Sequence, residues 1–427
     1  MRKRVVIIGG GFAGLQAARA LARAPVEVTL VDRQLVHIFQ PLLYQVATGS
    51  LSAESIVAPL RPLFRRQRNC TCLQAEVAGI DPDGQRVETD RGPLSYDYLV
   101  VAAGAQTSYF GNDHWARYCW SLKDVDDALA LRRQILGRFE AAEWAESAEA
   151  QRRLLQFVIV GGGPTGVEMA GAISELAHWV LPREHRRCDP RLAEILLVEA
   201  APTVLGPFPD QLQERALADL RTMGIDVRLD SPVTDISANR VTWREGTETR
   251  SRDALVIWAA GVAATPLTRQ LAEATGAAVD KAGRVTVDQY LRLPQRPEIF
   301  PVGDCVALED ARGKQVPGIA PAAIQQGRHV GRQIRRLVAG KAPAPFRYRD
   351  KGMLATVGRK FAVGLIGTRW RISGRLAWWL WLFVHLMYLV GFENRLVVLL
   401  RWAYSYLGRG RHARLLLRQT ESIDQSS

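Results

Sequence analysis

The first motif with a chemical role is a set of three glycines near the N-terminus. Gly9, Gly11 and Gly14 follow the apolar run VVII in GxGxxG spacing. A glycine loop between a buried strand and a helix lets a pyrophosphate approach the backbone and the N–H groups of the first helical turn. Asp32 stands at the end of the next apolar run, eighteen residues after Gly14, where a carboxylate can accept a hydrogen bond from an adenosine ribose hydroxyl. These residues therefore predict a dinucleotide site.

The same pattern returns about 150 residues later. Gly161, Gly163 and Gly166 follow the apolar run FVIV, and Glu199 ends the later run EILLVEA. The gap from Gly166 to Glu199 is longer than usual because HWVLPREHRRCDPRL is inserted before that run, so the acid could be misassigned. If the assignment is right, Glu199 accepts from the ribose 2′-hydroxyl and repels a 2′-phosphate, and no arginine is among the next three residues. A second dinucleotide site that prefers NADH to NADPH is expected.

A third signal lies in the stretch EIFPVGDCVAL. There Gly303 and Asp304 follow an apolar run, so that the aspartate could bind a flavin ribityl hydroxyl and the next amides could lie near its pyrophosphate. A Gly-Asp pair alone usually marks a turn, but two dinucleotide loops earlier in the chain favour the flavin interpretation. Cys305, beside it, is expected to be a small buried side chain and not a redox group.

The strands and helices expected around the glycine loops indicate an α/β fold with two Rossmann-like dinucleotide-binding domains. A chain of 427 residues has room for two or three domains. Apolar runs before each glycine loop indicate strands of parallel sheets, and a charged, alanine-rich stretch from residue 124 to 156 indicates one or two helices. The expected division is a first part of an FAD-binding domain (1–123), a helical connection (124–156), an NADH-binding domain (157–285), the second part of the FAD-binding domain (286–368) and a C-terminal helical membrane-association segment (369–427).

Cysteine usage argues against a thiol relay. The stretch RQLVHIFQPLLYQVATGSLS, after Asp32, is where disulfide reductases carry a CxxxxC pair, and it contains no cysteine. It shows no clean period and is expected to be a functional loop. The five cysteines form neither CxxC nor zinc-ligand spacing, which favours a reducing compartment and no metal. Only four apolar residues follow the basic start MRKR, too few for a signal peptide, so we expect a cytoplasmic N-terminus.

The net charge of +13 suits either nucleic acid or an anionic membrane, and its distribution favours the membrane. Residues 376–392 read LAWWLWLFVHLMYLVGF; as a helix they would reach about 25 Å, short of the ~30 Å hydrocarbon core. Around them, arginines stand against the single acid Glu393: Arg369, Arg371, Arg375, Arg395, Arg401, Arg409, Arg411, Arg414 and Arg418. This pattern is typical of a segment in the headgroup layer, although a buried helix with a solvated basic tail would also fit. No nucleic-acid motif is present.

Several longer stretches carry a family resemblance: VVIIGGGFAGL, HIFQPLLYQVATG, VGGGPTGVEMAGAI, APAAIQQGRHVG, DKGMLATVGRKFAVG and LFVHLMYLVGFENR. The chain resembles the type II NADH:quinone oxidoreductases among the two-dinucleotide-binding-domain flavoproteins. This resemblance implies FAD on the first glycine loop, NADH on the second, and Glu168 beside the nicotinamide and the flavin. Read without the family, Glu168 could equally be an acid that interacts with the helix dipole in the first turns of a helix.

The family also carries an AQxAxQ-like helix segment at its quinone pocket. Here that segment reads Ala-Pro-Ala-Ala-Ile-Gln, with Pro321 in place of the first glutamine, while Gln325 matches the second. The resemblance gives Gln325 a place at the quinone and leaves the role of the first glutamine in doubt. Without it, Gln325 and Gln326 would more often lie on the solvated side of a helix.

The function expected from these observations is hydride transfer from NADH to FAD and then transfer of two electrons to a quinone, menaquinone or ubiquinone, without proton pumping. The enzyme is expected at the cytoplasmic face of the cell membrane as a peripheral protein, with a homodimer left open. One alternative is a sulfide:quinone oxidoreductase, which needs cysteines on both sides of the flavin, whereas this chain has none after Cys305. Another is a flavin-bearing binding or scaffold protein with slow turnover.

Overall fold

The first layer is a parallel sheet that contains the first glycine loop. The structure, a computed structural model, describes residues 2–310 and 313–408. The sheet has the strand order β20-β9-β1-β2-β5, and every neighbouring pair is parallel. The apolar runs of residues 5–8 in β1 and 99–101 in β9 are buried, as expected of central strands covered on both faces. The strands are β1 (Lys3–Ile8), β2 (Val26–Asp32), β5 (Cys70–Gln74), β9 (Tyr98–Val101) and β20 (Ile299–Pro301).

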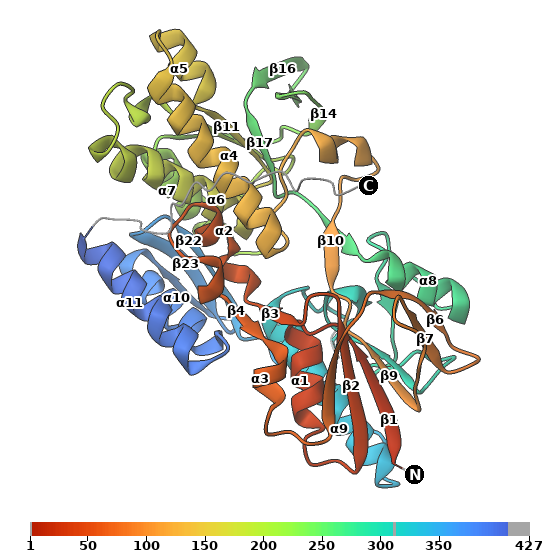
Figure 1. Ribbon diagram of the computed structural model, residues 1–427. Coiled ribbons are helices and arrows are strands. Elements are labelled where there is room, and N and C mark those ends of the chain that lie inside the picture. Colours follow the sequence, from red (N-terminus) through yellow and green to blue (C-terminus); the bar gives the residue numbers. More distant parts are fainter. Residues whose placement is uncertain (1, 311–312, 409–427) are drawn as a thin grey trace, which may run out of the picture.

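Two helices far apart in the sequence cover one face of this sheet. These are α1 (Phe12–Ala20), directly after the glycine loop, and α9 (Ala320–Val338), which pack closely against each other (Figure 1). Close packing needs small residues, because a Cβ at Gly327 or Gly331 would meet the backbone of α1. The smaller elements of this unit are β3 (Val36–Ile38), α2 (Leu43–Ala47), β4 (Val57–Pro59), α3 (Leu60–Phe64), β6 (Val77–Asp81), β7 (Arg86–Thr89), β8 (Leu94–Ser95), β19 (Val285–Thr286) and β21 (Val306–Ala307).

The second parallel sheet repeats this arrangement around the second glycine loop. Its strand order is β13-β12-β11-β17, and α6 (Pro164–Glu175) follows the loop. An antiparallel sheet of β14 (Val233–Ser237), β15 (Arg240–Glu245) and β16 (Glu248–Asp253) lies beside it. The remaining elements of this unit are β11 (Gln156–Val160), β12 (Glu194–Val198), α7 (Asp210–Thr222), β13 (Ile225–Arg228) and β17 (Leu255–Trp258).

Two crossings of the chain join the units. The stretch expected to be helical forms α4 (Val125–Trp144) and α5 (Ala148–Leu154), and β10 (Ala105–Thr107) pairs with β18 (Val262–Ala264). After this pairing, α8 (Pro266–Thr275) buries Leu271 in the core of the first unit. By packing, α8 therefore belongs with the first unit, although the division expected from the sequence placed residues 157–285 together in the second.

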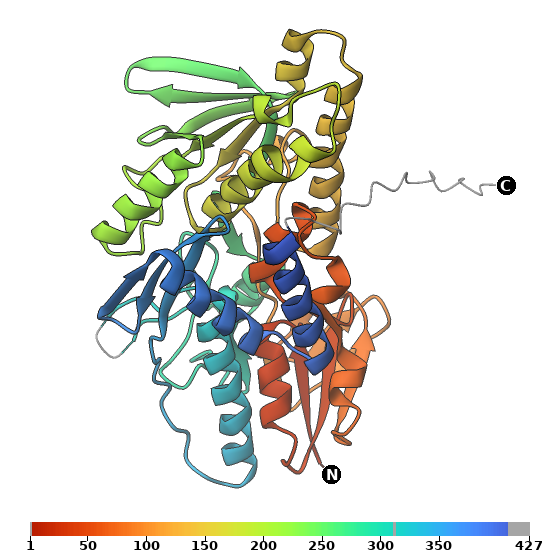
Figure 2. The same cartoon turned by 90° about the vertical axis from the view of Figure 1, so that its left-hand side faces the viewer.

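The last described part is an antiparallel sheet followed by two helices. The sheet consists of β22 (Gly352–Val357), β23 (Phe361–Ile366) and β24 (Trp370–Ser373), and the helices are α10 (Gly374–Tyr388) and α11 (Phe392–Gly408). Figure 2 shows this blue helix pair facing the viewer, in front of the junction between the two units. The expected apolar stretch 376–392 is therefore not one helix, because the chain turns between α10 and α11, where Gly391 has a φ of +95°.

No helix in the two described ranges is both long and apolar enough to cross a membrane. Of the nine arginines that were expected to face the membrane, only those before residue 409 lie in the described part of the chain. Arg409, Arg411, Arg414 and Arg418 lie outside the described residues, whereas Arg369, Arg371, Arg375 and Arg401 are exposed and Arg395 is half-buried.

Candidate functional site

The first glycine loop leaves open space where a ligand could approach. Gly9 has a φ of +94°, and a Cβ at Gly14 would meet the Gly9 carbonyl oxygen, so both positions require glycine. In contrast, a Cβ at Gly11 would meet nothing within 4 Å, and no side chain caps the start of α1. Asp32 lies at the loop, where its carboxylate accepts from the Gly10 N–H at 2.7 Å. The predicted residues are thus brought together in space.

The second loop has the same geometry. Gly161 has a φ of +108°, a Cβ at Gly166 would meet the Gly161 carbonyl oxygen, and a Cβ at Gly163 would meet nothing within 4 Å. The Glu199 carboxylate accepts from the N–H groups of Gly162 and, at 2.7 Å, Ala201. The inserted segment forms short helical turns between α6 and β12, so the long gap does not displace the acid from the loop.

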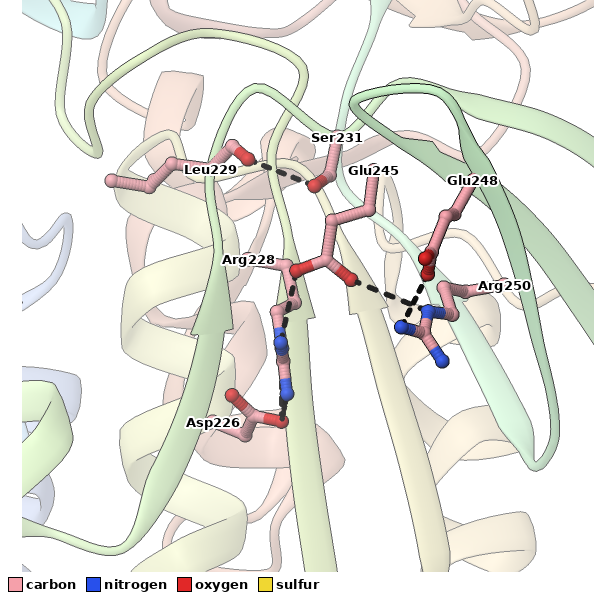
Figure 3. Close-up of polar contacts among 7 residues, drawn as sticks. All are labelled: Asp226, Arg228, Leu229, Ser231, Glu245, Glu248 and Arg250. Carbon is pink, nitrogen blue, oxygen red and sulfur yellow. Dashed lines mark hydrogen bonds and ion pairs between the residues drawn. The ribbon is translucent and has the colours of Figure 1, made fainter.

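An arginine close to Glu199 in the fold is held away from it. Arg228 ends the neighbouring strand β13 in register with Val198, so its side chain lies on the opposite sheet face from that of Glu199. There it bonds to Asp226 at 2.9 Å and to Glu245 at 2.9 Å, as Figure 3 shows. Figure 3 also shows Arg250 paired with Glu248 beside this group. Neither guanidinium is placed to attract a phosphate beside Glu199.

Gly303 and Asp304 lie at the carboxyl end of β20, close to the first loop. Gly303 has a φ of +83°, and its N–H donates to the buried Gln326 side chain at 2.5 Å. Burial lowers the pKa of Lys123, and the negative charge of Asp304 partly opposes this effect. The buried Cys305 thiol donates to the Val302 carbonyl at 3.1 Å, and burial raises its pKa to about 12, as expected of a structural cysteine.

Glu168 lies in a small cavity of about 40 Å³ between α6, β22 and the C-terminal helix pair. It is 9% exposed, and its carboxylate is 3.4 Å from the Thr356 N–H. Burial raises the pKa of Glu168 to about 8, against the opposing contact with Thr356. The side chain is therefore mostly protonated near neutral pH and can hold a proton for transfer.

A chain of hydrogen bonds joins this cavity to α11. The Tyr44 hydroxyl lies 3.1 Å from the Thr356 hydroxyl and accepts from the Gln45 amide at 3.0 Å. The Trp402 indole N–H then donates to the Gln45 amide oxygen at 2.9 Å. Trp378, Trp381 and Trp402, from the two C-terminal helices, complete the wall. The site thus connects α6 of the second unit to helices that were expected to bind the membrane.

Gln325 lies elsewhere, and its amide is engaged. It donates to the Arg349 carbonyl at 3.0 Å and accepts from the Arg349 N–H at 3.0 Å, so that it holds the segment before β22. Among the described residues, those lining the Glu168 cavity do not include Gln325. The structure therefore does not bring the two expected catalytic residues into one cavity, and a role for Gln325 at the quinone stays a prediction.

Sequence reasoning missed several residues of the site. Tyr44 and Gln45 lie in the stretch RQLVHIFQPLLYQVATGSLS, which was expected to be a functional loop and instead forms β3 and α2. Thr356 was quoted only as part of DKGMLATVGRKFAVG, which carries the family resemblance. The family resemblance of both stretches is the signal that could have directed attention to these three residues. Gln326, expected on the solvated side of its helix, is instead 3% exposed.

The arrangement fits two dinucleotide cofactors. At Gly11 and Gly163 a helix begins without a side-chain cap in open space, which leaves its N–H groups for a pyrophosphate. Gly9, Gly11, Gly14 and Asp32 would hold FAD with Gly303 and Asp304. Gly161, Gly163, Gly166 and Glu199 would hold NADH.

Comparisons with known proteins agree with this geometry. The pyridine nucleotide-disulphide oxidoreductase family model matches residues 3–327. The chain is 45% identical over 419 residues to the type II NADH:quinone oxidoreductase Ndh of Mycobacterium tuberculosis, covering 96% of this chain and 89% of that protein. Among solved structures, NDH2 from Plasmodium falciparum in complex with NADH has a TM-score of 0.86 at 19% identity. The match covers 98% of this chain and 100% of that one.

The fold alone is shared more widely. The sulfide:quinone oxidoreductase of Aquifex aeolicus has a TM-score of 0.73 at 19% identity, over 92% of this chain and 91% of that one. The far higher identity to the NADH enzyme, together with the buried, high-pKa cysteine at position 305, favours the main prediction over the sulfide alternative. The chain belongs to the type II NADH:quinone oxidoreductases of the pyridine nucleotide-disulphide oxidoreductase family.

Proposed function

We propose that this chain oxidises NADH and reduces a quinone while attached to the surface of a membrane. Bound FAD supplies the acceptor for the hydride and the donor of two electrons to the quinone. The observation that carries the proposal is the position of Glu168, which is buried between the helix of the second glycine loop and the tryptophans of the C-terminal helices. A carboxyl group that holds its proton near neutral pH can donate it to a reduced quinone.

The C-terminal helices support attachment to the membrane. Their inner faces bury Trp381 and Trp402, while their outer faces expose large apolar side chains at helical spacing. On α10 these are Leu376, Trp379, Phe383 and Met387, and on α11 they are Phe392, Leu396, Leu399, Leu400 and Tyr404. Apolar rows of this kind, with exposed arginines beside them, suit a helix pair that lies in the headgroup layer. We infer a peripheral position on the cytoplasmic face.

Steady-state oxidation of NADH with a short-chain quinone tests the activity directly. Protein with a flavin spectrum should consume NADH and quinone in equal amounts. Fast flavin reduction by NADH without reoxidation by quinone would instead favour the binding or scaffold alternative. Turnover with sulfide in place of NADH would favour the sulfide alternative.

Cofactor choice gives a first prediction. Since Glu199 should repel a 2′-phosphate and Arg228 is held on the other sheet face, NADH should be used at least about a hundredfold better than NADPH in kcat/KM. Glu199→Gln should narrow this ratio by weakening the repulsion. Equal kcat/KM for both cofactors in the wild type would mean that Glu199 does not face the ribose.

The glycine loops give a second prediction. Gly11→Ala and Gly163→Ala should both fold, because a Cβ at either position meets nothing within 4 Å of the protein. Gly11→Ala should lose most of its FAD, whereas Gly163→Ala should keep FAD and raise KM for NADH about tenfold, ~1.4 kcal/mol. Flavin absorbance per protein and steady-state kinetics measure the two effects. If the effects were exchanged between the variants, the loops would be assigned in the wrong order.

A further inference from the structure

A second, larger pocket lies apart from the Glu168 cavity. Its volume is about 370 Å³, and it opens where α1, α9 and the turn between α10 and α11 meet. Figure 2 shows the blue helix pair reaching the red α1 and the cyan α9 at this place. The two pockets share no lining residue, and the proposed function uses only the first.

The rim of this pocket, which we call the basic pocket, is strongly cationic. Arg19, Arg328, Lys351 and Arg395 line it, and among the described residues no acidic side chain does. Within the described ranges, none of these four residues has an ion pair within 4 Å. Partial burial and then the charges of Arg328 and Arg395 lower the pKa of Arg19, so both charges repel the Arg19 guanidinium group. Such a group is stabilised when an anion binds between its members.

The floor of the basic pocket contains a buried histidine, His37, whose ring has one nitrogen without a partner among the described residues. His37 is 1% exposed, and its Nδ1 lies 3.1 Å from the Gly10 carbonyl oxygen, to which it donates. Burial lowers the pKa of His37 to about 4, so its ring is neutral and Nε2 is an acceptor. In the described part of the chain, this Nε2 has no hydrogen-bond partner. A ligand that satisfies the pocket would therefore bring a hydroxyl as well as an anionic group.

Apolar side chains connect the basic pocket to the outer face of the helix pair. Ile324 and Val390 line it, and Met387 both lines it and stands 51% exposed at the end of the apolar row of α10. A molecule bound here can thus place its charged part among the arginines and its apolar part along α10. A free quinone carries no charge that could form an ion pair with these cationic side chains.

We propose that the basic pocket binds the headgroup of an anionic phospholipid, a phosphodiester that carries a free hydroxyl, such as phosphatidylglycerol. The phosphate lies among Arg19, Arg328 and Lys351, the headgroup hydroxyl donates to His37, and the acyl chains follow α10. This inference rests on the proposed attachment to the membrane and adds a specific lipid site to it.

Sedimentation of the full-length holoenzyme with phosphatidylcholine vesicles that contain phosphatidylglycerol tests the proposal. The double variant R19Q/R328Q should bind these vesicles about tenfold more weakly than the wild type. The matched control R375Q/R401Q removes the same charge from exposed positions on α10 and α11 outside the pocket, and it should lose clearly less. Arg395 is left intact because it donates to the carbonyls of Leu389 and Met387 and so holds the turn.

A change of lipid separates the hydroxyl from the charge. Vesicles with phosphatidylmethanol, which has the same charge and no hydroxyl, should bind the wild type more weakly than phosphatidylglycerol vesicles. Glycerol phosphate in solution, at the concentration of the accessible lipid, should not compete, because it lacks the acyl chains. Effective competition would assign the site to a soluble phosphate ester.

The outcomes distinguish this proposal from the proposed function. Equal losses in both double variants would overturn the lipid site and leave general membrane attachment standing. A raised KM for short-chain quinone in R19Q/R328Q, with unchanged vesicle binding, would assign the pocket to the quinone. If the wild-type enzyme oxidises NADH but binds none of the vesicles, both the lipid site and the proposed attachment to the membrane would be overturned.

Discussion

Replacing Glu168 with glutamine should slow NADH:quinone turnover at least about tenfold, which corresponds to ~1.4 kcal/mol of transition-state stabilisation. Glutamine keeps the shape of the side chain in the cavity but cannot release a proton. FAD content should not change, because Glu168 lies on α6 and not at the first glycine loop. Steady-state kinetics with a short-chain quinone, on protein of measured flavin content, checks this expectation.

Glu175→Gln is the matched control for this variant. Glu175 lies on the same helix and lines the same cavity, where it is 3% exposed and accepts from the Arg359 N–H. If both variants lose turnover equally, loss of a buried carboxylate, and not a specific role of Glu168, explains the effect. Wild-type rates in Glu168→Gln would return Glu168 to a structural role at the start of its helix.

The pH dependence of the free energy of unfolding should also reflect the buried carboxyl group of Glu168. Burial raises the pKa of Glu168 from 4.5 to about 8, so between these values the folded protein holds a proton that the unfolded chain releases. The contribution of this group to the free energy of unfolding is complete below about pH 4.5 and is lost as the pH rises to about 8. Denaturant unfolding of Glu168→Gln should lack that decline, and turnover of the wild type should fall above about pH 8 as the proton is lost.

The glycine loops could be predicted from the sequence because their chemistry is local. Gly9, Gly14 and the acid Asp32 are fixed by a strand, a turn and a helix that follow one another directly. Glu199 could be found despite its long gap because it ends an apolar run, and a strand in a parallel sheet delivers its last residue to the same edge as the loop. The family match and the two sheets confirm this part of the fold.

The Glu168 cavity could not be predicted in the same way. Its central hydrogen bond joins Tyr44 to Thr356, 312 residues apart, and no spacing rule relates the two positions. The placement of α8 was missed for a similar reason, because helical periodicity shows that a face is buried and not against which sheet. The turn at Gly391 interrupted a stretch whose apolar composition alone suggested one continuous helix.

The structure also changes how membrane attachment should be tested. Removing residues 369–427 would separate attachment from catalysis only if the helices were independent of the core. Trp381, Val398 and Trp402 instead belong to the larger hydrophobic core, and Trp381 is fully buried. Truncation should therefore destabilise the protein, and changes restricted to the outer faces of α10 and α11 are the sharper experiment.

The variant L376Q/F383Q/F392Q/L400Q should lose binding to anionic vesicles by at least about a hundredfold, because four side chains between 60% and 81% exposed would no longer enter the membrane. FAD content and turnover with a short-chain quinone should stay near wild type, while activity with long-tailed quinones in vesicles should fall. Salt should weaken wild-type binding without abolishing it, since it screens the arginines and leaves apolar burial intact.

The control F110Q/W144Q removes equally exposed apolar side chains, 67% and 77%, far from these helices in the sequence, and it should bind as the wild type does. If the fourfold variant keeps its FAD and still sediments with vesicles like the wild type, the outer face of α10 and α11 is not what holds the enzyme on the membrane.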